Sequence, residues 1–175
     1  GGLRQVLMRK KLIVANWKSS PTTLAEGETI VSAIDELLSS FGERERFSLV
    51  ICPPFVFIEE VAKMLGSGHL AQSAFLGAQD IAPQDTGALT GKVSGSMLAK
   101  LGVRYVIIGH SERRWKLGES DKIVNEKLRL ALDHELTPIV CVGERTREGR
   151  WREEIAAQVR ATFVGVSAEN IDKCL

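Results

Sequence analysis

The chain has 175 residues, 44% of them hydrophobic and 26% charged, which predicts one soluble globular domain with a substantial core. Its formal net charge of +1 gives no electrostatic surface for nucleic acid or for an anionic membrane, so neither is expected as a partner. Apolar runs reach about five residues, far short of the roughly 20 of a membrane-spanning helix, and no signal-peptide core is recognised, so a cytoplasmic location is expected.

The three cysteines, Cys52, Cys141 and Cys174, form an odd set without a CxxC pair. Neither a disulfide framework nor a zinc site is therefore predicted. Cys52 and Cys141 lie in or at the end of apolar runs, which favours small buried core residues over ligands or nucleophiles.

The chain opens with a segment that carries no periodic signal. Residues 1–7 are therefore set aside as upstream residues, and the domain is expected to span 8–175. Residues 12–15 indicate a short apolar strand, which is followed by Asn16 and Lys18. A lysine there is usually a solvated charge, and it becomes a candidate only because a second strand ends in a histidine.

Helical patterns alternate with further apolar strands. Ser20 is a good N-cap and Pro21 suits the first helical position, so a helix is predicted from there to about Ser39. Residues 47–52 return to strand. The next helix, closed by Gly66, has an apolar stripe that is interpreted as core packing: Phe55, Ile58, Val61, Ala62 and Leu65.

A third strand, 74–78, leads into an unusually long connection over 79–92 that is rich in Gly, Pro and Asp. Such length predicts a functional or interfacial loop. Ser94 is expected to cap a short helix that ends before Gly102.

The stretch VRYVIIGHSERR, residues 103–114, is the most informative. Its apolar run indicates a strand buried on both faces, as in parallel sheets, with His110 at the carboxyl end where ligands gather. Taken alone, His110 is more simply a loop histidine. Ser111 is a good N-cap, however, so His110 is expected beside the positive end of a short helical turn, which disfavours imidazolium. A neutral imidazole there can donate to a carbonyl or enolate oxygen.

One more strand and two more helices complete the pattern. A helix is predicted from Ser120 to about Leu136, a strand over 138–142 and a helix over 151–164, and a sixth apolar segment starts at the last two residues. His134 and His69 are interpreted as surface residues.

Five strands that alternate with helices predict parallel βαβ units. An open doubly wound sheet and a closed barrel both fit, but the nucleotide-binding open sheet needs a Gly-rich phosphate turn, and neither GxGxxG nor a Walker sequence is present. In a closed barrel the polar strand ends converge on one face, and the barrel is therefore the preferred fold. These strand ends are Lys18, Gln79, His110 and Glu144.

Several motifs occur in the order found in the triosephosphate isomerase family, which the chain resembles from Met8 to Leu175. The resemblance implies an α/β fold, a (βα)8 TIM barrel, here with about five βα units and without the sixth to eighth strands. It implies interconversion of dihydroxyacetone phosphate and D-glyceraldehyde 3-phosphate through an enediolate, in glycolysis and gluconeogenesis, without metal or organic cofactor. The motifs are NWK at 16–18, GAQD at 77–80, TGALTG at 86–91, VIIGHSERR at 106–114 and PIVCVGE at 138–144.

The resemblance also implies residue roles. His110 is the electrophile that polarises the substrate carbonyl and shuttles protons along the enediolate. Lys18 places positive charge near the phosphate and the developing oxyanion, with Asn16 positioning substrate beside it, and Glu112 is a buried partner that orders the site. A phosphorylated triose needs such a cation and donor, and the reaction also needs a carboxylate base.

The loop after the third strand reaches a neighbouring subunit in the family, so a homodimer of the complete protein is implied. Gln79, Thr90 and Gly91 are the residues assigned to that contact. Asp80 stands where asparagine is common in the family. Lys92 stands where glutamate is frequent, so its charge toward the partner, and toward Arg113, is reversed and one inter-subunit ion pair is not expected.

The family carries its catalytic glutamate on a lid after the sixth strand, and no such sequence is found here. A full barrel takes about 250 residues, so about 75 are expected to be absent from the carboxyl end. Glu112 and Glu144 lie at other strand ends and are not expected to replace that base. The isolated chain, with unpaired barrel edges, is predicted to show no isomerase turnover and a tendency to self-associate.

Two other interpretations are kept. The chain is either part of the isomerase or a non-catalytic barrel fragment that acts as a binding or assembly module, and the coding sequence past Leu175 separates them. Another barrel-type phosphosugar isomerase is less well supported, because NWK and GHSERR are specific motifs.

Overall fold

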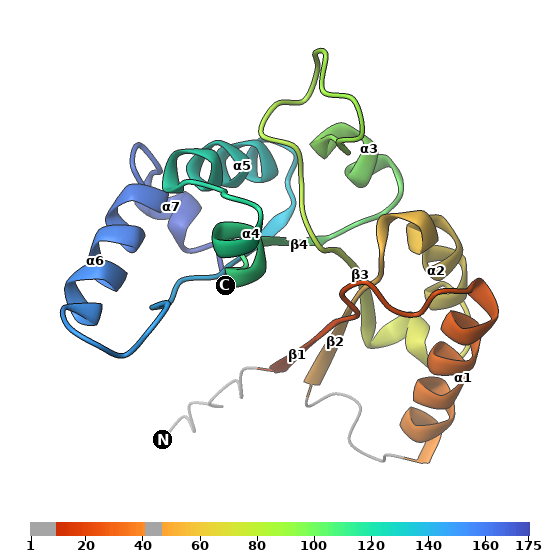
Figure 1. Ribbon diagram of the computed structural model, residues 1–175. Coiled ribbons are helices and arrows are strands. Elements are labelled where there is room, and N and C mark those ends of the chain that lie inside the picture. The colour runs from red at the N-terminus through yellow and green to blue at the C-terminus, as the bar shows by residue number, and fades with distance from the viewer. Residues whose placement is uncertain (1–9, 41–46) are drawn as a thin grey trace, which may run out of the picture. The chain divides into compact units, whose positions relative to one another are not determined.

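The computed structural model describes residues 10–40 and 47–175, and it shows strands that alternate with helices (Figure 1). Residues 1–7, expected to precede the domain, lie outside the described residues. The chain divides into two compact units, one up to Leu76 and one from Gly77 onward. The expected single domain over 8–175 stays a prediction.

The unit up to Leu76 contains β1 (Lys11–Asn16), α1 (Leu24–Ser40), β2 (Phe47–Cys52), α2 (Ile58–Leu65) and the first part of β3 (Ala74–Ala78). β1 pairs with β2 in parallel along its whole length, and β2 pairs with the first three residues of β3. The core of this unit is formed by fully buried side chains of β2 and α2: Val50, Ile51, Cys52, Ile58 and Val61.

The predicted start of α1 is wrong. The helix begins at Leu24, because Thr23 and Glu26 form a capping box: Thr23 Oγ1 accepts from the backbone N–H of Glu26 at 3.3 Å, and Glu26 Oε2 accepts from the N–H of Thr23 at 3.3 Å. Pro21 precedes the helix and is buried against it. The Ser-Pro pair resembles a helix start, but the capping box lies three residues further on.

The second helical region is split, because Phe55–Phe57 forms a 3-10 turn before α2. Phe55 is 37% exposed, so its expected place in the core stripe is wrong, whereas Ile58, Val61 and Leu65 are buried as predicted.

The unit from Gly77 contains the end of β3, β4 (Tyr105–Ile108) and β5 (Thr137–Val140), all parallel. The strand order is therefore the chain order, β1-β2-β3-β4-β5. Leu175 continues the pairing beside β5, since it exchanges backbone hydrogen bonds with Pro138 and Val140. The helices are α3 (Gly95–Lys100), α4 (Ser111–Lys116), α5 (Asp121–Asp133), α6 (Trp151–Thr162) and α7 (Ala168–Ile171).

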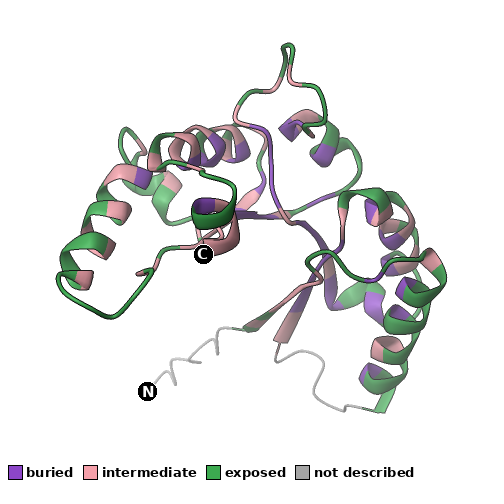
Figure 2. Ribbon diagram, in the orientation of Figure 1, coloured by how far each residue is buried: buried purple, intermediate pink, exposed green. Residues whose placement is uncertain are grey.

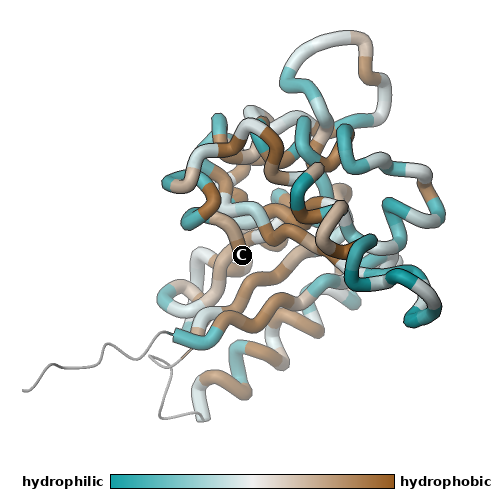
Figure 3. The backbone as a smooth tube through the Cα atoms, turned by 90° about the vertical axis from the view of Figure 1, so that its left-hand side faces the viewer, coloured by the Kyte–Doolittle hydropathy of each residue, from teal (hydrophilic) through white to brown (hydrophobic). Residues whose placement is uncertain are grey.

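β4 is buried on both faces, as its unbroken apolar run predicts. Val106 and Ile108 are fully buried and Ile107 is 3% exposed. Figure 2 shows buried residues in purple along the inner strands, and Figure 3 shows apolar stretches in brown that alternate along the chain with polar stretches in teal.

The two histidines outside the central motif differ in their surroundings. His69 is about half exposed, as expected, and its Nδ1 lies 3.2 Å from Asp35 Oδ2. The surface interpretation of His134 is wrong: its side chain is 25% exposed, and its Nε2 lies 3.0 Å from Asp85 Oδ1. His134 therefore ties the end of α5 to the loop after β3.

Candidate active site

His110 follows β4 and is itself the N-cap of α4, whereas Ser111, the predicted cap, is the first helical residue. The imidazole Nδ1 accepts from the backbone N–H of Glu112 at 3.3 Å. An accepting Nδ1 carries no proton, so the proton of the neutral ring lies on Nε2, which becomes a hydrogen-bond donor. The ring is 24% exposed.

Glu112 lies beside the histidine but is not the buried partner that the family resemblance implies. Its carboxylate Oε2 is 3.5 Å from His110 Nδ1, and its side chain is 40% exposed. Its backbone N–H orders the imidazole, which is a role that the side-chain chemistry did not predict.

A cavity of about 210 Å³ opens next to His110. Its walls include Trp115 from α4 and Cys141, Val142 and Gly143 from the segment after β5. Gly143 is held there by Gln158 of α6, whose amide both donates to the Gly143 carbonyl at 3.0 Å and accepts from its N–H at 3.1 Å. The cavity therefore has a fixed wall at the carboxyl end of β5.

The three cysteines are expected to react with a thiol reagent at different rates. Cys52 is fully buried, and burial raises its pKa to about 12, so it is a protonated thiol without solvent access. Cys141 and Cys174 are only partly buried. At pH 8 we expect an alkylating reagent to modify these two first and Cys52 only after unfolding, measured by mass spectrometry of quenched digests. Equal rates in the native protein would contradict this, and equal rates in denaturant serve as the control.

Asn16 and Lys18 form a tight turn at the end of β1. The backbone N–H of Lys18 donates to Asn16 Oδ1 at 2.9 Å, and Lys18 has a φ of +56°, a left-handed conformation that is uncommon for a residue with a side chain. Trp17 donates to the carbonyl of Cys52 and extends the β1–β2 pairing up to this turn. Strained backbone of this kind clusters at functional sites.

The structure thus brings Asn16 close to Lys18 in one unit and His110 close to Glu112 in the other. Both pairs lie at the carboxyl ends of parallel strands: Asn16 is the last residue of β1, and His110 comes two positions after the end of β4. Glu144, the polar residue after β5, forms an ion pair with Arg147 at 2.9 Å. Hydrogen bonding from its own backbone and from Arg147 lowers the pKa of the Glu144 carboxyl, so this carboxylate is ionised at neutral pH.

The long connection after β3 is a closed loop. Its neck is formed by the backbone bond from Ala82 N–H to the Val93 carbonyl at 2.8 Å, and Thr90 and Gly91 lie in the loop beyond it. Asp85 Oδ1 accepts a hydrogen bond from the backbone N–H of Ser96 at 2.8 Å, which connects the loop to α3. No helix or strand forms over 79–92, as predicted.

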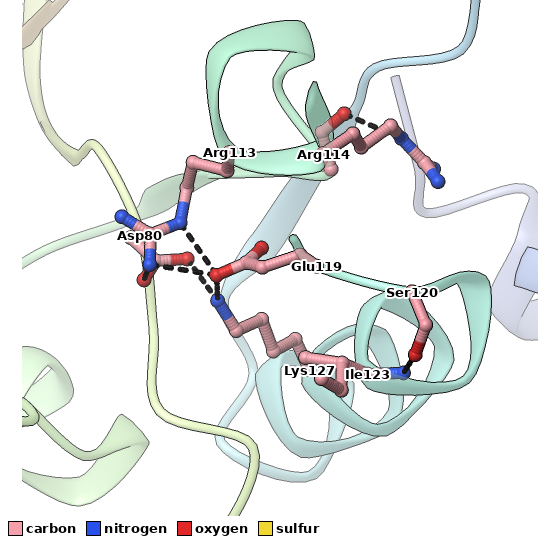
Figure 4. Close-up of polar contacts among 8 residues, drawn as sticks. Asp80, Arg113, Arg114, Glu119, Ser120, Ile123 and Lys127 are labelled. Atoms are coloured by element: carbon pink, nitrogen blue, oxygen red, sulfur yellow. Dashed lines mark hydrogen bonds and ion pairs between the residues drawn. The ribbon is translucent and has the colours of Figure 1, made fainter. Parts of the chain in front are cut away.

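A buried ion cluster anchors the start of this loop (Figure 4). The Lys127 side chain is 1% exposed, and its Nζ lies 2.6 Å from Asp80 Oδ1 and 2.5 Å from Glu119 Oε1. Arg113 Nη2 lies 2.8 Å from Asp80 Oδ2 and 2.6 Å from Glu119 Oε1. The sequence singled out Asp80 and Arg113 separately, but it did not reveal this cluster.

The two carboxyl groups of the cluster differ in their pKa. Burial raises the pKa of Asp80, although Lys127 and Arg113 oppose this effect. Burial acts in the same direction on Glu119, but hydrogen bonds from Arg113 and Lys127 outweigh it and lower the pKa. The ionised form of Glu119 is thus the one that the two cations stabilise most.

The part of the chain that the structure describes shows neither a metal site of clustered side chains nor a membrane-spanning helix. No group of three or more His, Cys, Asp or Glu side chains is arranged to hold a metal ion there. No helix within residues 10–40 and 47–175 has the length and apolar character needed to cross a membrane.

Parallel strands that alternate with helices and end in polar residues define a protein of the βα-barrel class, here a partial barrel. The family model described as triosephosphate isomerase matches residues 11–175. The chain belongs to the triosephosphate isomerase family.

Curated relatives give the same result. The chain is 44% identical over 167 residues to the triosephosphate isomerase of Chloroflexus aurantiacus, covering 94% of this chain and 64% of the relative. It is 40% identical over 169 residues to that of Roseiflexus castenholzii, with 95% and 63% covered, and 41% identical over 167 residues to that of Trichodesmium erythraeum, with 94% and 66% covered. The chain thus spans 63–66% of the length of these relatives.

Proposed function

We propose that this chain is part of a triosephosphate isomerase that interconverts dihydroxyacetone phosphate and D-glyceraldehyde 3-phosphate in glycolysis and gluconeogenesis in the cytoplasm. The observation that carries the proposal is the hydrogen bond from the Glu112 N–H to His110 Nδ1, which leaves Nε2–H as a donor. A neutral donor next to a cavity suits a carbonyl oxygen that gains charge as an enediolate forms.

Lys18 supplies the positive charge for the substrate phosphate and for the developing oxyanion. Its left-handed backbone and the Asn16 bond fix the start of its side chain after β1. The resemblance to the triosephosphate isomerase family assigns Lys18 and His110 to the same substrate, the lysine to its phosphate and the histidine to its carbonyl. Asn16 holds the turn and positions substrate next to the lysine.

The carbon-bound proton must be taken by a carboxylate, and neither nearby glutamate suits that task. Glu112 contributes its backbone to the histidine and is 40% exposed, while Glu144 is paired with Arg147. A base of depressed pKa, as Glu144 has, is a weak proton acceptor. We therefore assign the base to the sixth strand of the family's barrel, outside this sequence.

A chimera tests the proposal. In it, this chain replaces the matched region of the Chloroflexus aurantiacus relative, so that the remaining third of the relative completes the barrel. We expect the chimera to interconvert the two triose phosphates in a coupled assay, and the 175-residue chain alone to remain at the level of a buffer control. A folded chimera without turnover would contradict the proposal.

The same experiment addresses the alternative, a non-catalytic binding or assembly module. β1 exposes Ile13 to 51%, an apolar side chain that a further strand or a partner would cover. A folded, inactive chimera would favour this module. We also propose that the complete protein is a homodimer and that the loop with Gln79, Thr90 and Gly91 forms the contact. Analytical ultracentrifugation of the active chimera measures its oligomeric state.

A further inference from the structure

We propose that Arg114 is a positioning residue for His110: it holds the peptide groups on both sides of the histidine so that the ring stays in the Nε2–H tautomer. The inference rests on the proposed function in one respect only, namely that the His110 Nε2–H donates to the substrate. The geometry itself involves Arg114, Gly109, Asp121 and Cys141, all of them within the unit that begins at Gly77.

Arg114 forms hydrogen bonds to the peptide groups on both sides of His110. Arg114 Nε donates to the carbonyl oxygen of Gly109 at 2.7 Å, and the Arg114 backbone N–H donates to the carbonyl oxygen of His110 at 3.0 Å. The His110 carbonyl also accepts from the Arg113 backbone N–H at 2.9 Å, and both backbone bonds are independent of the side chains, so the Arg114 side chain acts through its bond to the Gly109 carbonyl. Together these bonds set the extended backbone of His110, φ −52° and ψ 141°, which allows its Nδ1 to reach the N–H of Glu112.

The guanidinium of Arg114 is also bonded to groups on two other elements. Its side chain is 6% exposed, Nη1 lies 2.5 Å from Asp121 Oδ1, and Nη2 donates to the Cys141 carbonyl at 3.3 Å. The fork therefore connects the end of β4, the end of β5 and the first turn of α5. A lysine has one donor position and cannot satisfy three acceptors in these directions.

Gly109 is matched to this arrangement. Its φ is +70°, and a Cβ atom there would lie 2.8 Å from Arg114 Nη2 and 3.0 Å from Val124 Cγ1. The glycine in the GHSERR motif is thus required by the close approach of the guanidinium as well as by the turn.

The neighbouring Arg113 provides a matched control on the same helix. Figure 4 shows its side chain directed to Asp80 and Glu119, whereas that of Arg114 points away from them. Both arginines are largely buried and paired with carboxylates, but only the side chain of Arg114 reaches the Gly109 carbonyl. A general loss of stability is thus separable from a specific loss of ring orientation.

The test is ring 15N NMR of the 175-residue chain at about pH 8.5. The chain has three histidines, so His69 and His134 are internal references. In the wild type we expect an unprotonated Nδ1 and a protonated Nε2 for His110. In Arg114→Lys we expect both His110 nitrogen signals to move toward the averaged position of exchanging tautomers, while Arg113→Lys leaves them in place.

Unchanged His110 signals in a folded Arg114→Lys protein would overturn the proposal, as would an equal shift in Arg113→Lys. If Arg114→Lys does not fold, the wild-type protein is heated in steps instead, and its NMR spectrum is recorded at each step. We expect the Arg114 Nε–H signal and the His110 tautomer to change together. Loss of the Nε–H signal while the His110 ring signals stay unchanged would overturn the proposal.

Turnover gives a second and separate readout. In an active chimera we expect Arg114→Lys to lower kcat about 10- to 100-fold with little change in KM, because a misplaced donor affects the chemical step rather than phosphate binding. An unchanged kcat would overturn the proposal. A chimera without activity would contradict the proposed function, but it would leave the tautomer measurement fully valid.

Discussion

Lys127→Met is expected to lower the free energy of unfolding by about 3–5 kcal/mol, because it leaves two buried carboxylates with one cation between them. The Lys127 side chain is 1% exposed, and its ammonium lies between Asp80 and Glu119, whose side chains are 5% and 7% exposed. Methionine fills a similar volume, so packing changes little. Urea unfolding followed by circular dichroism measures the difference.

Lys122→Met is the matched control on the same helix. Lys122 is 86% exposed and its Nζ lies 3.9 Å from Glu126 Oε1, so we expect a change within about 0.5 kcal/mol. If Lys127→Met behaves like this control, the buried ion cluster does not contribute as argued.

A double variant tests the charge balance in the cluster. Asp80→Asn removes the carboxylate whose charge burial disfavours, so in the Lys127→Met background it leaves Arg113 and Glu119 as a balanced pair. We expect the double variant to be more stable than Lys127→Met alone, and comparison with Asp80→Asn alone gives the coupling energy between the two sites. A double variant that is less stable than the single one would show that Asp80 acts in another way.

The strands can be predicted from the sequence because buried strands have continuous runs of apolar residues. β3 has the predicted limits, 74–78, and β4 is buried on both faces, as the run before Gly109 indicated. Strand starts do not follow from hydropathy alone: β4 begins at Tyr105 rather than at the predicted Val103. Local hydropathy determines which residues are buried, whereas backbone pairing with neighbours determines where a strand starts.

Helix starts depend on a few hydrogen bonds and were predicted less well. The signal for α1 was present as Thr23 and Glu26 at capping-box spacing, but the Ser-Pro pair resembled a start as well. For α4 the cap is His110 rather than Ser111, because an imidazole nitrogen with the right backbone angles accepts as a hydroxyl does. Sequence reasoning placed the histidine next to the helix start without giving it that bond.

The site's supporting contacts were not predictable, because they join residues distant in the chain. Asp80 and Lys127 are 47 positions apart, and no local pattern marks a lysine in α5 as buried. The Arg114 contact with the Cys141 carbonyl spans 27 positions. The motif GHSERR gave the residue types, and the three-dimensional fold gave their partners.

His110→Gln in the active chimera is expected to lower kcat by about 10²–10³-fold, the usual cost of losing one positioned donor at a developing oxyanion. In His110, Nδ1 accepts from the Glu112 N–H and so holds the ring while Nε2 donates to the substrate. Glutamine has a flexible side chain and no ring that fixes a donor in this way. KM is expected to change little, since the phosphate is assigned to Lys18.

His69→Gln is the matched control: His69 is 47% exposed and bonded to Asp35, so kcat should stay within about twofold. A folded His110→Gln chimera that keeps more than about a tenth of its activity would show that the imidazole donor is not required for the chemical step, and the proposed role of His110 would have to be abandoned.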